Sequence, residues 1–303
     1  MNYEVAIIGG GPAGLNAALV LGRARKKVAL FDNNEPRNKV THASHGFITR
    51  DGVTPTEFRR IAYEEVLRYP TVNHWDTEVT DIQRTEDGFV IATRSGEQVH
   101  AGKVILATGL KEQLPEIDGI KAYYGKSLFA CPFCDGWELR DQPLVVISDV
   151  PQIFHKVKLL LQWTRDLVVC TNGNADLLNE DQREQLAARK IAVIDTPVSG
   201  FTGDNGMLEQ VHFADGTSIT RSGGFIDPAQ TPTVNFKEPL GYDVSDNGAL
   251  VTDPFGKTTA EGVYAAGDYA YVMPAQLIYA AASGSKAAMS VMADLTEEYW
   301  HSL

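Results

Sequence analysis

Apolar and polar positions alternate along the first third of the chain in the pattern of a mixed α/β domain. A short apolar strand at residues 3–8 runs into a glycine-rich turn, and apolar residues at helical spacing follow from Leu15 to Leu21. A second apolar strand at residues 27–31 ends at Asp32. The further elements that the pattern predicts are a helix starting at a Thr54–Glu57 capping box, strands at 78–82, 88–93 and 98–100, and a buried strand at 104–109.

Gly9, Gly11 and Gly14 form a G-x-G-x-x-G motif between the first strand and its helix. Strand, glycine turn, helix, strand and acid stand in the order that a dinucleotide-binding fold requires. The glycines let the backbone approach a pyrophosphate, the start of the helix attracts its charge, and Asp32 can accept a hydrogen bond from a ribose hydroxyl. A glycine-rich turn that binds nothing is the alternative, and the flanking strands and the acid favour the dinucleotide site.

The middle of the chain leaves this first domain and later returns to it. From about Leu114 the chain enters a second, smaller domain, and it comes back after residues 236–239. We therefore expect a discontinuous domain of residues 1–113 and 240–303, interrupted by a domain of residues 114–239.

The returning part adds one strand and one helix to the first domain. An apolar strand at residues 262–266 ends at Gly267 and Asp268. Gln276 then precedes a helix that runs through residues 280–291.

Cys131 and Cys134 enclose two residues and are followed at once by Asp135 and Gly136. Two thiols three residues apart lie on adjoining positions of one helical turn, near enough to close a small disulfide ring. Pro132 suits the first turn of a helix, which directs the positive end of that helix at the first sulfur and lowers its thiol pKa. Such a pair cycles between dithiol and disulfide and passes two electrons at a time, so it requires an electron partner.

Composition limits the class of protein. The 303 residues suffice for about two domains, and 44% apolar with 22% charged residues is typical of a soluble globular protein. The net charge of −12 disfavours nucleic acid as a partner. The first residues lack the basic start and apolar core of a signal peptide. The apolar stretch 277–295 carries Lys286 and small polar residues, so we expect a buried helix there and no membrane span.

Three cysteines without an export signal favour the reducing cytoplasm. Zinc normally takes four ligands, and the chain offers one C-x-x-C pair plus a distant Cys170, so we expect no metal site. Cys170 ends an apolar run and is most simply a buried small hydrophobic residue. The C-x-x-C pair is therefore expected to be catalytic.

Four segments together resemble the low-molecular-weight thioredoxin reductase family, and they cover nearly the whole chain in the family's order. They are residues 9–14, the strand end at 107–109, the C-x-x-C-D-G at 131–136, and residues 262–268 with Gln276. The resemblance implies an α/β fold of two Rossmann-like dinucleotide-binding domains of the three-layer ββα type, joined by a two-strand hinge. It further implies FAD in the first domain, NADPH in the second, and a homodimer.

The same resemblance implies roles for individual residues. Cys134 would react with the flavin and Cys131 with the substrate, while Asp135 would transfer protons. An acid that stabilises only the start of the helix is the alternative for Asp135. Asp268 would meet the ribityl and phosphate end of the cofactor, and Gln276 would face the flavin ring. The full set of implied FAD-binding residues is Gly9, Gly11, Pro12, Ala13, Gly14, Asp32, Thr108, Gly109, Gly267, Asp268 and Gln276.

The second nucleotide site departs from the family pattern. Residues 148–152, between a predicted strand at 143–147 and an amphipathic helix from Ile153, contain no glycine. Side chains therefore occupy the space where backbone should approach a pyrophosphate, and Asp149 would repel a phosphate. The strand at 167–171 is followed by Asn-Gly-Asn in place of arginines that would bind the 2′-phosphate of NADPH. We expect a degenerate domain that does not use NADPH and serves as a scaffold for the thiols.

The C-P-F-C segment and residues 45–52 resemble one branch, the dithiol oxidases of epidithio and dithiolopyrrolone metabolism, such as the gliotoxin and holomycin enzymes. This resemblance implies that a substrate dithiol becomes a disulfide while electrons pass to FAD and then to oxygen or another acceptor. His42 or His45 would be a base near the flavin, and a solvated loop histidine is the alternative for each.

Three alternatives stay open beside the dithiol oxidase. The first is a reductase of thioredoxin-like proteins that receives electrons from ferredoxin or flavodoxin. The second is an NADPH-dependent thioredoxin reductase with an atypical nucleotide pocket. The third is a flavin-binding redox sensor without enzymatic turnover. The substrate is thus either a small dithiol or disulfide or a thioredoxin-like protein.

Overall fold

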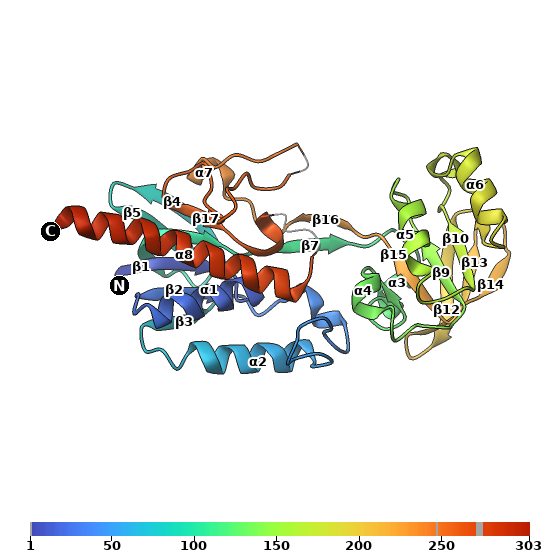
Figure 1. Ribbon diagram of the computed structural model, residues 1–303, viewed down its shortest axis with the longest axis horizontal. Helices are drawn as coiled ribbons and strands as arrows, with labels where there is room; N and C mark the ends of the chain where they lie inside the picture. The colour runs from blue at the N-terminus through green and yellow to red at the C-terminus, as the bar shows by residue number, and fades with distance from the viewer. Residues whose placement is uncertain (1, 247, 271–274) are drawn as a thin grey trace. The chain divides into compact units, whose positions relative to one another are not determined.

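The computed structural model describes residues 2–246, 248–270 and 275–303, which form two compact units (Figure 1). Unit 1 comprises Met1–Lys39, Gly46–Lys111 and Thr231–Leu303, and unit 2 comprises Val40–His45 and Glu112–Gln230. The strands are β1 (Asn2–Ile8), β2 (Val28–Asp32), β3 (Val72–Asp76), β4 (Val79–Thr85), β5 (Gly88–Thr93), β6 (Gln98–Leu106), β7 (Leu110–Gln113), β8 (Leu128–Phe129), β9 (Leu144–Ile147), β10 (Leu167–Cys170), β11 (Ala192–Ile194), β12 (Val198–Asp204), β13 (Met207–Phe213), β14 (Ser218–Thr220), β15 (Gly223–Ile226), β16 (Ala229–Pro232) and β17 (Val263–Ala265). The helices are α1 (Pro12–Arg23), α2 (Pro55–Val66), α3 (Ile120–Tyr123), α4 (Pro132–Asp135), α5 (Ile153–Leu160), α6 (Glu180–Ala187), α7 (Lys237–Leu240) and α8 (Leu277–Ser302), with 3-10 turns η1 (Arg37–Val40), η2 (Ala175–Leu177) and η3 (Gly267–Ala270).

Unit 1 is built on a sheet of order β3-β2-β1-β6-β5-β4, in which β17 also pairs with β6. The strands β3, β2, β1, β6 and β17 run parallel, whereas β4, β5 and β6 pair antiparallel. The long strand β6 serves both parts, because its first half pairs with β5 and its second half with β17. Two strands predicted at 98–100 and 104–109 are therefore one continuous strand up to Leu106.

Alternate residues of the central strands pack into two different cores. In β1, Ala6 and Ile8 join the core formed with β4, β5 and the segment after β16, while Val5 and Ile7 join the core formed with α1 and α8. A strand buried on both faces reads as a continuous apolar run, as residues 3–8 do. Unit 1 is thus a three-layer ββα arrangement.

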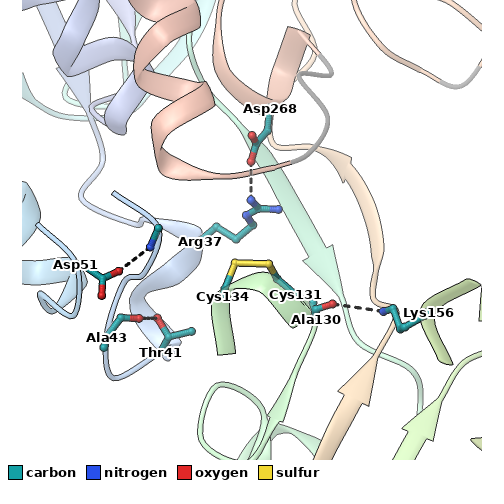
Figure 2. Close-up of a disulfide and its surroundings, with 10 residues drawn as sticks. Arg37, Thr41, Ala43, Asp51, Ala130, Cys131, Cys134, Lys156 and Asp268 are labelled. Carbon is teal, nitrogen blue, oxygen red and sulfur yellow. Dashed lines mark hydrogen bonds and ion pairs between the residues drawn. A yellow bond between two sulfur atoms is a disulfide. The ribbon is translucent and has the colours of Figure 1, made fainter. Parts of the chain in front are cut away.

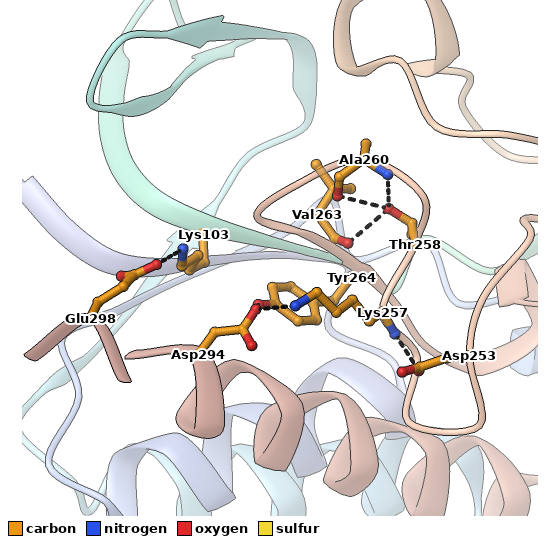
Figure 3. A network of polar contacts seen from close by, with 9 residues as sticks. All are labelled: Lys103, Asp253, Lys257, Thr258, Ala260, Val263, Tyr264, Asp294 and Glu298. Carbon is orange, nitrogen blue, oxygen red and sulfur yellow. Dashed lines mark hydrogen bonds and ion pairs between the residues drawn. The ribbon is translucent and has the colours of Figure 1, made fainter. Parts of the chain in front are cut away.

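The long helix α8 is fixed to β6 and β17 near its end, where Glu298 pairs with Lys103 and Asp294 accepts from Tyr264 (Figure 3). Near its start it packs on α1, where the side-chain amide of Asn16 donates to the carbonyl of Ala281 at 2.9 Å. Near its end, Asp294 accepts hydrogen bonds from the Tyr264 hydroxyl at 2.5 Å and from the Lys257 ammonium at 2.6 Å. Burial and the neighbouring carboxylate of Asp294 raise the pKa of Tyr264 well above its ordinary value. The helix runs from Leu277 to Ser302, further than the predicted 280–291.

Unit 2 repeats the same layering on a smaller scale. Its sheet has the order β11-β10-β9-β15-β8, and all neighbours in it are parallel. The helices α5 and α6 pack on one face, and the antiparallel sheet β12-β13-β14 packs on the other. Cys170 is fully buried, as predicted, in the core between the parallel sheet and the antiparallel sheet. Burial raises the pKa of its thiol to about 12.

The chain passes between the units through β7 and β16, which pair in a two-stranded sheet. The units differ from the predicted ranges in two places. Residues 231–239 belong to unit 1, because Phe236 is buried in the unit 1 core. Residues 40–45 belong to unit 2, where Gly125 approaches the carbonyl of Val40 so closely that a Cβ on Gly125 would lie 2.4 Å from it.

Among the described residues, no helix combines the length and the hydropathy that a bilayer span needs. Nor does that part of the chain bring together three or more His, Cys, Asp or Glu side chains in a group that could hold a metal ion.

Candidate functional site

Cys131 and Cys134 form a disulfide at the start of α4, with their Cα atoms 5.3 Å apart (Figure 2). Strand β8 leads into this segment, Cys131 is the N-cap of α4, and Pro132 takes the first helical position, as predicted. The carbonyl of Cys131 accepts hydrogen bonds from the amides of Cys134 at 3.1 Å and of Asp135 at 3.2 Å. The turn places both sulfurs side by side in the way that a C-x-x-C pair requires.

Gly136 lets this turn pack closely. A Cβ at Gly136 would lie 2.5 Å from the carbonyl of Pro132 and 2.9 Å from the ring of Trp163. Real Cβ atoms do not approach so near, so the residue after Asp135 has to be glycine for α4 to sit on Trp163.

Asp135 is the acid beside the disulfide, and its pKa is raised to about 7. Burial is the largest cause, the negative charge of Glu138 adds to it, and His45 acts in the opposite direction. His45 lies against Glu138, with 3.6 Å between Nε2 and Oε1. A carboxyl group in this setting can hold or release a proton near neutral pH. His42 is exposed.

Glu138 was not among the predicted site residues. Its position four residues after Cys134 on the segment that follows the C-x-x-C pair is a signal that sequence reasoning could have used.

The glycine turn of unit 1 has the shape of a phosphate cradle. Gly9 has φ 113°, and a Cβ at Gly14 would lie 1.8 Å from the carbonyl oxygen of Gly9, so both positions require glycine. At Gly11, by contrast, a Cβ would meet no heavy atom within 4 Å, so the backbone there is open to a ligand. Pro12 then begins α1, and Ala13 and Gly14 are buried in its first turn.

Asp32 ends β2 and is held by two residues of α2 that were not among the predicted site residues. Arg59 forms an ion pair with Asp32 and donates to the carbonyl of Gly10 at 2.7 Å, and the Tyr63 hydroxyl donates to Asp32 at 2.7 Å. Burial raises the pKa of Asp32, but the hydrogen bonds and the charge of Arg59 outweigh it and bring that pKa below its ordinary value. The carboxylate is therefore ionised at the place where a ribose hydroxyl would donate to it. No local sequence pattern marks Arg59 or Tyr63, because α2 reaches Asp32 only in the folded chain.

The carboxyl ends of β6 and β17 complete the cradle. Thr108 follows β6, and its hydroxyl is buried without a hydrogen-bond partner among the described residues, as expected of a group that awaits a polar ligand. The amide of Gly267 donates to the Ser283 hydroxyl at 2.8 Å. Asp268 is paired with Arg37 at 2.5 Å (Figure 2). Burial raises the pKa of Asp268 above its ordinary value, although the charge and hydrogen bond of Arg37 act in the opposite direction.

Two further predicted residues are Gly109 and Gln276. Gly109 has φ 67° directly after Thr108. Gln276 is the N-cap of α8, and residues 271–274 before it lie outside the described residues. Apart from Gln276, the predicted cofactor residues of unit 1 lie in the segments that directly follow β1, β6 and β17 or at the end of β2, the edge at which parallel sheets bind dinucleotides.

Residues 3–284 match the family of pyridine nucleotide-disulphide oxidoreductases. The chain belongs to this family. A Bacillus anthracis protein provisionally named thioredoxin reductase TrxB has a crystal structure with TM-score 0.94 to this chain, at 46% identity over 98% of this chain and 99% of that one. The crystal structure of HlmI gives TM-score 0.92 at 34% identity, over 99% of this chain and 95% of that one. Thioredoxin reductase aclD of Aspergillus oryzae is 32% identical over 97% of this chain and 96% of that protein.

The protein is a thioredoxin reductase-like oxidoreductase with a C-x-x-C disulfide, and the predicted fold of two dinucleotide-binding domains is confirmed. Membership of the family implies a flavin cofactor. The residues of unit 1 fit such a group: the open backbone at Gly11 and the buried, unpartnered hydroxyl of Thr108 are the features a bound dinucleotide would use.

The second dinucleotide-binding domain of this oxidoreductase lacks the matching cradle. Between β9 and α5 the amide of Val150 donates to the Ser148 hydroxyl at 3.3 Å, and the carboxylate of Asp149 is exposed. No glycine opens the backbone of this turn.

Further along the same edge, after β10 and β11, lies an internal ion pair between Arg183 and Asp195. Asp195 accepts from both terminal nitrogens of Arg183, at 2.9 and 3.0 Å, and from the Thr171 hydroxyl at 2.7 Å. The Arg183 hydrogen bonds are the largest influence on Asp195 and lower its pKa. Arg183 is thus committed to Asp195, and because it comes from α6 it does not appear in the segment that follows β10 in the sequence.

Proposed function

We propose that the chain is an FAD-dependent dithiol oxidase that does not use a nicotinamide cofactor and passes electrons to oxygen or another acceptor. The observation that carries the proposal is the turn between β9 and α5, where a nucleotide pyrophosphate would need glycines and the chain has Ser148, Asp149 and Pro151. The resemblance of the C-P-F-C segment and of residues 45–52 to the dithiol oxidase branch favours the same function.

The charges at the unit 2 edge support the same conclusion. A nucleotide brings negative phosphates, and the exposed Asp149 repels them at the turn. Arg183 already forms two hydrogen bonds with Asp195, directly after β11, and would have to break them to bind a 2′-phosphate.

We assign FAD to unit 1 and the thiol chemistry to unit 2. Gly9, Gly11 and Gly14 would take the pyrophosphate at the start of α1, and Asp32, held by Arg59 and Tyr63, would accept from the adenosine ribose. Thr108, Gly109, Gly267, Asp268 and Gln276 would line the flavin end. When bound, FAD supplies a two-electron acceptor that returns Cys131 and Cys134 to the disulfide and passes the electron pair onward.

The protein's own residues carry out the exchange with substrate. A substrate thiolate attacks Cys131, the Cys131–Cys134 bond breaks, and Cys134 leaves as a thiolate. The second substrate thiol then attacks the mixed disulfide, so that the substrate leaves as a disulfide and both protein sulfurs are reduced. Asp135, with a pKa of about 7, can take the proton of the incoming thiol or give one to a leaving sulfur.

The relatives favour a second candidate function, reduction of a thioredoxin-like protein. The Aspergillus oryzae and Bacillus anthracis proteins both carry the name thioredoxin reductase. In that case the electrons would flow in the opposite direction, and a small protein such as ferredoxin or flavodoxin would supply them. For either function, the family resemblance supports a homodimer that works in the cytoplasm.

A dithiol assay in air tests the proposal. The flavin-loaded protein is given a panel of small dithiols, and disulfide and peroxide are measured together. We expect about one peroxide for each disulfide formed, and loss of turnover in Cys134→Ser with retention in the control Cys170→Ala. No turnover with any dithiol, together with reduction of a thioredoxin by reduced ferredoxin, would instead establish the second function.

A further inference from the structure

Lys156 lies at the point in unit 2 where the order of the strands in the parallel sheet reverses. The strands β10 and β11 extend from one side of β9, and β15 and β8 extend from the other, so the switch point lies between β9 and β15. In folds of this type the ligand binds outside the carboxyl ends of the strands at that point. Here Lys156, from α5, reaches the same edge.

The ammonium group of Lys156 has three partners, which use all three of its donors. It forms an ion pair with Asp227, which follows β15, and donates to the carbonyl of Ile226 at 3.1 Å and to the carbonyl of Ala130 at 3.3 Å (Figure 2). Ala130 directly precedes Cys131. One side chain therefore links the end of β15 to the peptide that enters the disulfide.

Because Lys156 is buried, its hydrogen bonds favour one conformation of the segment that carries the disulfide. The side chain of Lys156 is 13% exposed and that of Asp227 is 23% exposed, and Oδ2 of Asp227 is buried with no hydrogen-bond partner among the described residues. A buried ammonium without its carbonyl acceptors is costly, so the arrangement stabilises the segment with the Ala130 carbonyl directed at Lys156.

We propose that Lys156 is a positioning residue for the redox disulfide. By holding the carbonyl of Ala130 against the end of β15, it fixes the backbone that enters Cys131 and keeps the two sulfurs close together. The link lowers the entropic cost of closing the disulfide ring and so favours the disulfide over the dithiol. The inference concerns the thiol pair alone and holds whichever way electrons flow in the proposed function.

The test is the dithiol–disulfide equilibrium of Cys131 and Cys134 in the flavin-loaded protein. Anaerobic mixtures of reduced and oxidised dithiothreitol set the reduction potential of the solution. In this exchange one sulfur–sulfur bond breaks in the protein, one forms in dithiothreitol, and two electrons and two protons move to the protein. Acid quenching, alkylation and mass spectrometry then give the fraction of reduced protein. For Lys156→Met we expect the equilibrium constant for disulfide formation to fall about threefold to tenfold, the worth of one hydrogen bond.

A matched control and a second variant separate positioning from stability. Lys158→Met removes the same charge from the same helix, where Lys158 is exposed and lies over the ring of Phe154, and it should keep the parent equilibrium. Lys156→Met combined with Asp227→Leu removes the buried ion pair as a whole, which proteins tolerate better than an unpaired charge. This double variant should fold and show the same shift as Lys156→Met. A parent-like equilibrium in the double variant would overturn the proposal, even if Lys156→Met itself failed to fold.

Discussion

At the scale of single residues, the surroundings of two carboxyl groups set their pKa values. Asp32 and Asp135 are both partly or wholly buried, yet their pKa values move in opposite directions. Arg59 and Tyr63 stabilise the negative charge of Asp32 and outweigh its burial, whereas burial raises the pKa of Asp135 and the like charge of Glu138 adds to it. The first carboxylate is suited to hold a ligand and the second to exchange a proton.

Asp135→Asn should change the pH dependence of stability in a defined direction. Because the folded pKa of Asp135 is raised from 3.8 to about 7, the folded state resists an ionisation that the unfolded chain undergoes above about pH 4. This penalty is absent below pH about 4, grows up to pH about 7 and stays constant above it. Urea unfolding of the disulfide form should therefore show Asp135→Asn more stable than the parent by about 1–3 kcal/mol at pH 8, and equal to it near pH 4.

Glu138→Gln is the control for that measurement. It removes the like charge and leaves the burial of Asp135, so it should give a smaller gain at pH 8. If the stability of Asp135→Asn ran parallel to the parent from pH 4 to pH 8, the raised pKa of Asp135 would be wrong.

At the scale of elements, the glycine turns and apolar runs were readable from sequence, and side-chain partners were not. The helix predicted from Thr54 begins there, and the Thr54 hydroxyl accepts from the amide of Glu57 at 3.2 Å. The carboxylate of Glu57, however, bonds Arg60 within its own helix, in place of the return bond of a capping box. Strand β3 went unpredicted, because three of its five residues are exposed and its apolar pattern is weak.

Two glycines of the same turn allow a paired test of the cradle. A Cβ at Gly14 would overlap the Gly9 carbonyl, so Gly14→Ala should destabilise unit 1 by about 2–4 kcal/mol, measured by thermal or urea unfolding. A Cβ at Gly11 meets nothing, so Gly11→Ala should fold with a loss below about 1 kcal/mol and yet bind FAD at least about tenfold more weakly. Equal FAD affinity in Gly11→Ala and the parent would remove the pyrophosphate from this turn.

At the scale of the whole molecule, local patterns predicted which segments are dinucleotide-binding domains but not where each begins. Phe236 packs in the unit 1 core although it lies before the predicted boundary, and nothing in its neighbourhood of the sequence marks the change. For the same reason, the sequence did not predict three residues that form long-range contacts: Arg59, Arg183 and Lys156. Each lies on a helix whose exposed-looking polar face becomes the inside of a site once the sheet is formed.

The most direct test of the account is an anaerobic titration of the flavin-loaded protein with two reductants in turn. If unit 2 has lost its pyrophosphate cradle, NADPH should leave the absorbance near 450 nm almost unchanged, and a small dithiol should then bleach it through Cys131 and Cys134. Rapid bleaching by NADPH at about micromolar concentration, with no response to dithiols, would contradict the account.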